Sequence, residues 1–149
     1  DLMFVGKYNN SIDSKSRVIV PAKFRDELEG RCIIAKSLDR CLTIYPLAQW
    51  EKFVEEKLEI LPAGNPQARK LKRHFYSSAA ECDVDKQGRL TIPQELKEYA
   101  GIEKELITVG SDKTIEVWSR EHWEDELDPD TGELMNASEV AESMEQYGF

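Results

Sequence analysis

Residues Asp13–Pro21 read DSKSRVIVP, and 72 residues later Asp85–Pro93 read DKQGRLTIP. Both stretches follow the pattern Asp-x-x-x-Arg, then a short run of β-forming residues, then proline. The similarity continues further along the chain, where Trp50-Glu51 aligns with Trp123-Glu124 once a one-residue insertion is allowed in the second copy. Because two blocks recur in the same order, internal duplication explains them better than chance. The chain is therefore predicted to contain two copies of one small β-rich unit.

Each copy is predicted to fold as a β-β-α-β-β unit. A turn-forming segment separates the first two strands, and Pro21 or Pro93 ends the second strand and begins a helix. Gly30 or Gly101 then ends that helix. The predicted strands of the first unit are 4–12, 17–20, 32–35 and 41–45, and those of the second are 80–84, 89–92, 106–109 and 114–118.

Further helices are predicted to flank the two units. One begins at Pro46 and extends to about Ile60, a linker follows at Leu61–Pro66, and a second helix covers about residues 67–78. A helix from Ser119 follows the second unit, and residues 133–149 fit either one amphipathic helix or partial disorder. The predicted domains are residues 4–60, residues 67–127 and an acidic tail of residues 128–149.

The two units are predicted to share one hydrophobic core. Each contributes only about 40 residues of pattern, which is marginal for an independent domain. Apolar positions that recur between the copies, such as Ile44 with Val117 and Trp50 with Trp123, support one packed interior. The expected fold class is therefore α+β, with two tandem units arranged as a dimer within one chain.

Charge is distributed unevenly along the chain. The net charge is −9, but ten acidic residues and no Lys or Arg occur from Glu121 onward. Residues 1–120 hold 20 basic and 19 acidic residues (29 − 10), a net charge of +1. The acidity is a property of the C-terminal region, so double-stranded DNA remains a possible partner for the rest of the chain.

Basic side chains in and after the two turns are the candidate DNA contacts. Lys15 and Arg17 belong to the first turn, and Lys86 and Arg89 belong to the second. Arginine can make two hydrogen bonds to guanine O6 and N7 or bind a phosphate, while lysine supplies a point charge. A β-hairpin that carries such residues can enter the major groove.

Lys7 and Arg25 are secondary candidates for DNA contact, and ordinary solvation explains each of them equally well. Asp13 and Asp85 are predicted to stabilise the turns by accepting backbone N–H groups. A surface ion pair between each Asp and its Arg, with no further role, is the simplest alternative. An enzyme hypothesis would use the two Asp residues as a carboxylate pair, but the nearby Arg favours a permanently ionised structural group.

Neither a catalytic set nor a metal or cofactor site is predicted. His74 and His122 have no partners at metal-ligand spacing. Cys32, Cys41 and Cys82 form no C-x-x-C pair or disulfide framework, and they are interpreted as small strand residues of a protein in a reducing cytosol. No signal peptide is recognisable, and no apolar run approaches the roughly 20 residues of a membrane span.

Several of these motifs together resemble the MraZ family. The matching residues in the first half are Phe4-x-Gly6, Asp13-x-Lys15-x-Arg17, Pro21 and Phe24-Arg25. Those in the second half are Arg73-x-Phe75, Glu81, Asp85-x-x-Gly88-Arg89 and Ile92-Pro93. The resemblance extends to about Glu126. Ser16 departs from the pattern, because the family has glycine there, as at Gly88, and a serine would be strained if the position needs a positive φ.

The resemblance implies AbrB-like swapped-hairpin units that form a pseudo-dimer, assemble into a homo-oligomeric ring and bind double-stranded DNA. It further implies a cytoplasmic, nucleoid-associated transcriptional regulator that acts on repeats upstream of a cell-division and cell-wall gene cluster. An AbrB-like interaction protein of the antitoxin type, with the acidic tail as its partner-binding element, is the alternative.

Overall fold

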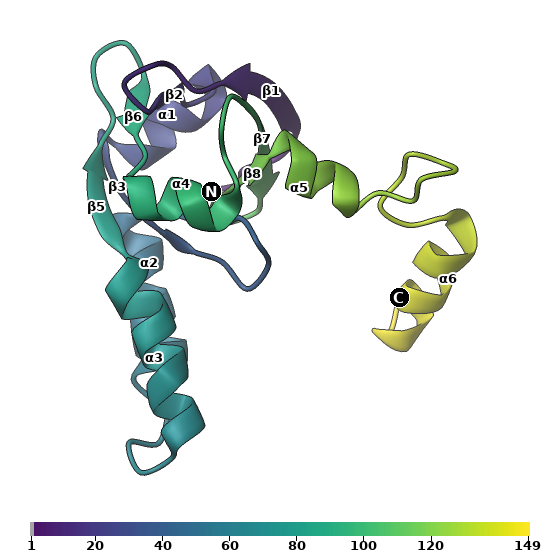
Figure 1. Ribbon diagram of the computed structural model, residues 1–149. Helices are drawn as coiled ribbons and strands as arrows, with labels where there is room; N and C mark the ends of the chain where they lie inside the picture. The colour runs from purple at the N-terminus through teal and green to yellow at the C-terminus, as the bar shows by residue number, and fades with distance from the viewer. Residues whose placement is uncertain (1) are drawn as a thin grey trace.

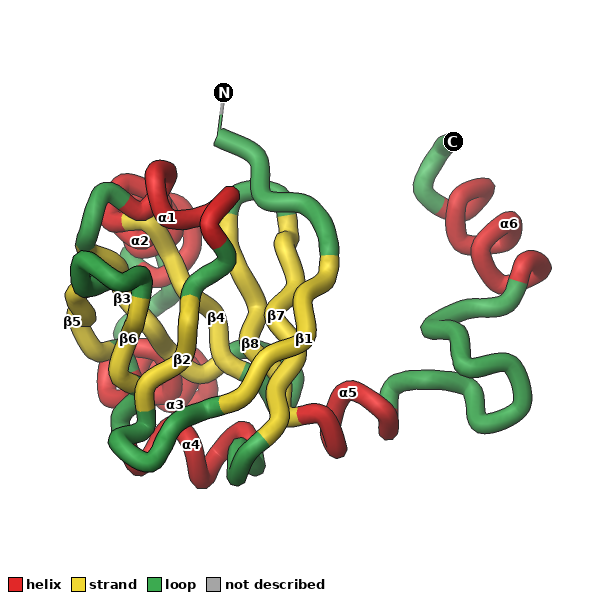
Figure 2. Tube along the Cα trace, turned by 90° about the horizontal axis from the view of Figure 1, so that it is seen from above, coloured by secondary structure: helices red, strands yellow, loops and turns green. Residues whose placement is uncertain are grey.

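The computed structural model describes residues 2–149. Its centre is a six-stranded antiparallel sheet in the order β1-β7-β8-β4-β3-β5, and β2 pairs with β6 in a separate two-stranded ribbon (Figures 1 and 2). The strands are β1 Lys7–Ser11, β2 Arg17–Ile19, β3 Arg31–Lys36, β4 Leu42–Pro46, β5 Ala80–Asp83, β6 Arg89–Thr91, β7 Glu105–Ser111 and β8 Thr114–Ser119.

Six α-helices and one π-helical turn, η1, complete the fold. They are α1 Ala22–Leu28, α2 Leu47–Phe53, η1 Val54–Leu58, α3 Pro66–Ser78, α4 Gln94–Ala100, α5 Arg120–Asp125 and α6 Ala137–Gln146. Pro21, Pro46 and Pro93 are the N-cap residues of α1, α2 and α4, one position earlier than the first helical residue predicted for proline. No helix within residues 2–149 is long and apolar enough to cross a membrane.

The two units are related by an internal pseudo-two-fold axis. The strand order reads symmetrically, with the hairpins β3–β4 and β7–β8 joined through β4 and β8 at the centre. Val18 pairs with Leu90 at the middle of the ribbon, and Thr43 pairs with Glu116 at the middle of the β4–β8 ladder. The edge strands are exchanged, because β1 of the first unit joins β7 and β5 of the second joins β3. The predicted α+β fold with tandem, swapped units is confirmed.

The two Asp-x-x-x-Arg turns have the span of a tight hairpin, but the strands that flank each turn do not pair with each other. The first turn is closed locally, since the N–H of Asp13 donates to the carbonyl of Arg17 at 2.9 Å. The strands on either side of it nevertheless diverge, with β1 pairing with β7 and β2 pairing with β6. An isolated two-stranded hairpin is only marginally stable. The exchange instead extends the central sheet and places Val18 against Leu90 in a shared interior.

The main core lies between the central sheet on one side and the ribbon, α1 and α4 on the other. Both units contribute equivalent side chains to it: Val18 and Leu90, Val20 and Ile92, Phe24 and Leu96, and Leu28 and Ala100. Ile44 and Val117 belong to this core as predicted, but Trp50 and Trp123 lie on the opposite, outer face of the sheet. The alternation of strand side chains explains the difference, because Ile44 and Tyr45 point to opposite faces.

Helices cover the outer face unequally. On the first half, α2, η1 and α3 form a helical hairpin, with the rings of Phe53 and Phe75 5.0 Å apart. Asn65 caps α3 by accepting from the N–H groups of Gln67 and Ala68. On the second half only α5 lies on the sheet, and α6 stands away from the body of the protein (Figures 1 and 2). Of the two possibilities for residues 133–149, the structure shows a helix.

Candidate nucleic-acid interface

The two Asp-x-x-x-Arg turns have the same internal geometry. Oδ1 of Asp13 accepts the backbone N–H groups of Lys15 and Arg17, both at 2.9 Å, and Oδ2 accepts Nε of Arg17 at 2.7 Å. Asp85 accepts the equivalent N–H groups at 2.9 and 2.8 Å and Nε of Arg89 at 2.8 Å. Each aspartate therefore shapes its turn and also orients the arginine that follows.

These contacts determine the protonation of both carboxylates. The backbone N–H of Arg17 is the main cause that lowers the pKa of Asp13, and that of Arg89 acts in the same way on Asp85. Both aspartates consequently stay ionised at neutral pH, which suits a structural acceptor and not a general acid. Both ion pairs are partly exposed, so positioning of the guanidinium matters more than their contribution to folding stability.

Each turn is braced by a basic residue from the other unit. Ser16 and Gly88 occupy the same position with φ of 60° and 80°, so this position has a positive φ in both copies. Nζ of Lys97, on α4, donates to Oγ of Ser16 at 2.8 Å. Arg25, on α1, lies so close to Gly88 that a Cβ at position 88 would overlap its guanidinium. Strain at the serine is thus accompanied by a hydrogen bond that glycine could not make.

The ribbon presents one face to solvent. Val18 points into the core, while Arg17 and Ile19 point outward opposite Thr91 and Arg89. The side chains of Arg17 and Arg89 are 27% and 30% exposed, and Ile19 is 50% exposed. Arg17 and Arg89 are diagonal neighbours on this face, about 7–8 Å apart in such a pairing.

The turns lie at opposite ends of the ribbon. The carbonyl of Ser16 accepts from the N–H of Ile92, and the carbonyl of Gly88 accepts from the N–H of Val20, both at 2.8 Å. Because the two strands are antiparallel, four residues separate the turns along the ribbon, a distance of about 14 Å at ~3.4 Å per residue. Lys15 and Lys86 are therefore displayed at the two ends of one surface that carries both arginines in its middle. We call this surface, Lys15, Arg17, Ile19, Lys86, Arg89 and Thr91, the ribbon face.

The secondary candidates lie in different places. Arg25 is adjacent to the second turn, where its Nε donates to the carbonyl of Val20 at 2.8 Å. Lys7 lies at the far end of β1, on another part of the surface, with its ammonium 5.7 Å from the ring centroid of Trp123. Pro21 and Pro93 follow the two ribbon strands and direct the chain into α1 and α4. The structure thus brings Lys15, Arg17, Lys86, Arg89 and Arg25 together and leaves Lys7 apart from them.

Ile19 and Thr91 were not among the sequence candidates. Their signal was the alternation in the runs Val18-Ile19-Val20 and Leu90-Thr91-Ile92, whose middle residues must face away from the flanking ones. The charge pattern drew attention to the arginines and lysines alone.

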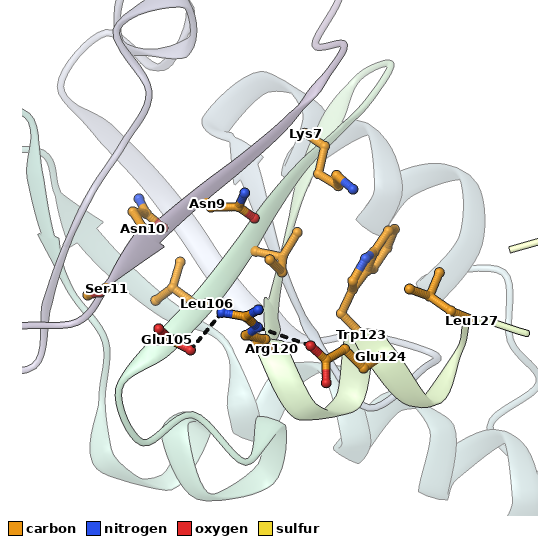
Figure 3. A pocket seen from close by; sticks show the side chains of 11 residues that line it. Lys7, Asn9, Asn10, Ser11, Glu105, Leu106, Arg120, Trp123, Glu124 and Leu127 are labelled. Carbon is orange, nitrogen blue, oxygen red and sulfur yellow. Dashed lines mark hydrogen bonds and ion pairs between the residues drawn. The ribbon is translucent and has the colours of Figure 1, made fainter. Parts of the chain in front are cut away.

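A groove on the outer face is the other concave feature of interest (Figure 3). It is lined by residues of β1, β7, α5 and the segment just after α5, among them Lys7, Asn9, Ile107, Trp123 and Leu127. Arg120 crosses its floor, where its guanidinium bonds to Glu124 and Glu105, both at 3.0 Å. These two carboxylates, Glu124 foremost, raise the pKa of Arg120.

No group of three or more His, Cys, Asp or Glu residues within residues 2–149 is placed to hold a metal ion. The three cysteines are free thiols. Burial raises the pKa of Cys32 and Cys41 to about 12 and that of Cys82 to about 11. All three thiols are protonated at neutral pH and are poor nucleophiles or ligands.

Comparison with known proteins gives a consistent result. A family model described as "MraZ protein, putative antitoxin-like" matches the chain twice, at residues 3–74 and 75–144. "Transcriptional regulator MraZ" of Clostridium tetani is 46% identical over 147 residues, which is 99% of this chain and 100% of that protein. The proteins of the same name from Clostridium acetobutylicum and Caldicellulosiruptor bescii are 47% and 46% identical, with the same coverage of 99% and 100%. The two matches each contain one copy of the Asp-x-x-x-Arg motif, in agreement with an internal duplication, and the chain belongs to the MraZ family.

Proposed function

We propose that this protein is a transcriptional regulator that binds double-stranded DNA through its ribbon face. The observation that carries the proposal is the pairing of β2 with β6, which puts Arg17 and Arg89 on one exposed surface related by the pseudo-two-fold axis. The relatives named as transcriptional regulators, which align with nearly the whole chain, support the same function.

The dimensions of the ribbon face suit the major groove. A two-stranded β-ribbon can enter this groove, which is about 12 Å wide. With its turns about 14 Å apart, the ribbon would bring Lys15 and Lys86 to the phosphates on either side. Arg25, beside the second turn, would add a further phosphate contact, while Lys7 faces elsewhere and takes no part.

The two arginine side chains are held in an orientation that favours base recognition. Nε of each is bonded to its aspartate, which restrains the side chain and leaves the terminal nitrogens of the guanidinium available for other acceptors. Those nitrogens can donate to guanine O6 and N7, and the methyl groups of Ile19 and Thr91 can contact a thymine methyl. The pseudo-two-fold axis of the ribbon would then coincide with a dyad of the DNA, so one chain would recognise a short site with two similar halves.

A single ribbon face supplies few phosphate contacts, so useful affinity favours several chains acting on repeated sites. This agrees with the ring assembly and the upstream repeats of the cell-division and cell-wall gene cluster that the family resemblance implies. We propose those repeats as the target. We further propose that the protein is cytoplasmic and associated with the nucleoid.

The decisive experiment compares Arg17→Ala and Arg89→Ala with Arg31→Ala, a control that removes an exposed arginine on β3. Affinity is measured for DNA carrying the upstream repeats and for shuffled DNA, over a salt series. We expect each ribbon variant to lose about 1–3 kcal/mol per base contact and to discriminate less between the two DNAs. The logarithm of the wild-type affinity should fall linearly with the logarithm of the salt concentration.

Melting temperature and oligomer mass should stay unchanged in all three variants. The proposal fails if Arg31→Ala weakens binding as much as Arg17→Ala does, or if the affinity of the wild type is insensitive to salt. The antitoxin-type alternative places the active surface in the acidic tail, so under that hypothesis the ribbon variants would keep full activity.

A further inference from the structure

In the first unit, the helix α3 covers apolar side chains on the outer face of the sheet. Phe75 is only 4% exposed and packs on Phe53, and the ring of Tyr76 meets the ring of Trp50 at 6.4 Å. Oγ of Ser78 accepts from the backbone N–H of Lys36 at 3.1 Å. In the first unit, α3 therefore covers the apolar surface made by α2 and the adjacent strands.

The equivalent surface of the second unit has no such cover. By the internal alignment Trp123 corresponds to Trp50, and by the strand registers Ile107 of β7 corresponds to Ile33 of β3. Where α3 lies on the first unit, the second unit has the groove of Figure 3, which is about 400 Å³ in volume and is lined by Ile107, Trp123 and Leu127. We call it the outer groove.

The segment that corresponds to α3 in chain order is α6. Val140 and Met144 have the same i, i+4 spacing as Leu71 and Phe75 of α3, but both are exposed, at 40% and 43%, whereas Phe75 of α3 is buried. No residue of α6 is buried, although a capping box between Asn136 and Glu139 starts the helix. A helix of ten residues is marginal in water unless its apolar side packs on something.

We propose that α6 of one copy of the chain occupies the outer groove of a second copy. The connection from α5 favours a second copy over the same chain. Asp128 closes a turn: its N–H donates to the carbonyl of Glu133 and its carbonyl accepts from the N–H of Gly132, both at 2.8 Å. Its Oδ1 accepts from the N–H groups of Asp130 and Thr131. Beyond this turn α6 points away from the groove of its own chain (Figures 1 and 2).

Charge supports the same occupant. The charged residues of α6 are Glu139, Glu142 and Glu145, and the helix contains no Lys or Arg. Lys7 lies at the edge of the outer groove with its ammonium over Trp123, whereas Arg120 is already bonded to Glu105 and Glu124. An acidic amphipathic helix can therefore place its apolar side in the groove and a glutamate beside Lys7.

This contact joins two different surfaces, α6 of one copy and the groove of the next. Such a heterologous contact repeats from copy to copy and closes into a ring when the rotation allows it. The groove lies on the outer face, on the side of the sheet away from the core and the ribbon, so the contact leaves the ribbon face of every copy free. The inference goes beyond DNA binding and does not depend on it.

A first test measures the native mass of the full-length protein and two variants. Val140→Asp puts a charge on the apolar side of α6, and Ser138→Asp puts the same charge on the opposite side of the same turn. We expect wild type and Ser138→Asp to be multi-subunit assemblies of equal mass, and Val140→Asp to shift to the monomer. A Val140→Asp assembly of wild-type mass would overturn the proposal.

A second test identifies the copy that receives α6. Two chains of different length, one with Met144→Cys and the other with Asn9→Cys in the groove, are mixed and mildly oxidised. The native cysteines are buried or half-buried with raised pKa values, so they provide little background. We expect disulfide-linked pairs of unlike chains.

A chain carrying both substitutions serves as the converse. If it forms only an internal disulfide and migrates as a monomer, α6 docks on its own chain and the proposal is wrong. Arg17→Ala should keep the mass of the wild type, so failure of DNA binding and failure of assembly are distinguishable.

Discussion

Ser16 and Gly88 hold the same left-handed position in the two turns, yet their surroundings differ. At Gly88 the guanidinium of Arg25 occupies the space that a Cβ would need. At Ser16 the equivalent basic residue is Lys97, whose ammonium group donates a hydrogen bond to the serine hydroxyl. The two turns therefore have the same backbone conformation but different side-chain contacts: Gly88 lies against Arg25, and Ser16 is hydrogen-bonded to Lys97.

We predict that Gly88→Ala destabilises the protein by about 1–2 kcal/mol, the cost of a left-handed conformation for a residue with a Cβ. The methyl group also forces Arg25 to move and weakens its bond to Val20. Ser16→Ala is the matched control, because it keeps a Cβ and loses only the hydroxyl. Denaturant unfolding measures both changes. Equal destabilisation by the two substitutions would contradict this account of the turns.

The carboxylates of Asp13 and Asp85 give the stability a pH dependence of known sign. Their pKa values are lowered in the folded protein, so the stability they contribute is present above the unfolded pKa of about 3.9 and is lost as the pH falls through the folded pKa. We predict that Asp13→Asn/Asp85→Asn melts below the wild type at pH 7 and that the difference narrows below pH 4. Asp26→Asn, on the exposed side of α1, controls for simple loss of a carboxylate. A difference that widens on acidification would refute the assignment.

Individual elements were largely predictable from the sequence, and their partners were not. The β-branched run at Val18–Val20 and the prolines that follow it mark strand ends and helix starts correctly within one or two residues. Strand pairing depends on which edge is available in the complete fold, and local turn chemistry at Asp13 indicates a hairpin whether or not the flanking strands pair. Alternation along the two strands indicates the outward positions of Ile19 and Thr91, but only the β2–β6 register shows that each lies opposite an arginine.

The helices α3 and α6 have the same apolar spacing in sequence but differ in their packing. Both carry an apolar i, i+4 pair, but only Phe75 finds a partner in the same chain. Amphipathic spacing predicts that a helix needs a surface and does not say on which molecule that surface lies.

For α3 we predict that Phe75→Ala costs about 3–5 kcal/mol, as expected for truncation of a buried aromatic side chain. Leu71→Ala, one turn earlier and 40% exposed, should cost much less. Chemical denaturation followed by tryptophan fluorescence would report on the nearby Trp50. Similar costs for the two substitutions would mean that α3 does not pack on the sheet as described.

At the scale of the whole molecule, duplication has produced a fold in which neither unit is complete. Each unit gives its first strand to the other's hairpin, and the core takes equivalent side chains from both. In the proposed docking of α6, one unit again completes another, this time between two copies of the chain. Exchange within the chain closes the pseudo-dimer, and exchange between chains would extend it.

The last prediction concerns a chain cut within residues 61–65, at the tip of the α2–α3 helical hairpin. The first fragment retains β1 without β7, and the second retains β5 without β3, so each has an edge strand and a core face that lack their partners. We therefore expect neither fragment alone to be a folded monomer. Because Val18 and Leu90 are equivalent, a fragment could still pair with a second copy of itself. Mixing the two fragments should give a one-to-one complex with the circular dichroism of the intact protein. Native mass and far-ultraviolet spectra of each fragment and of the mixture decide the matter, and a folded monomeric fragment would show that the two units are independent domains after all.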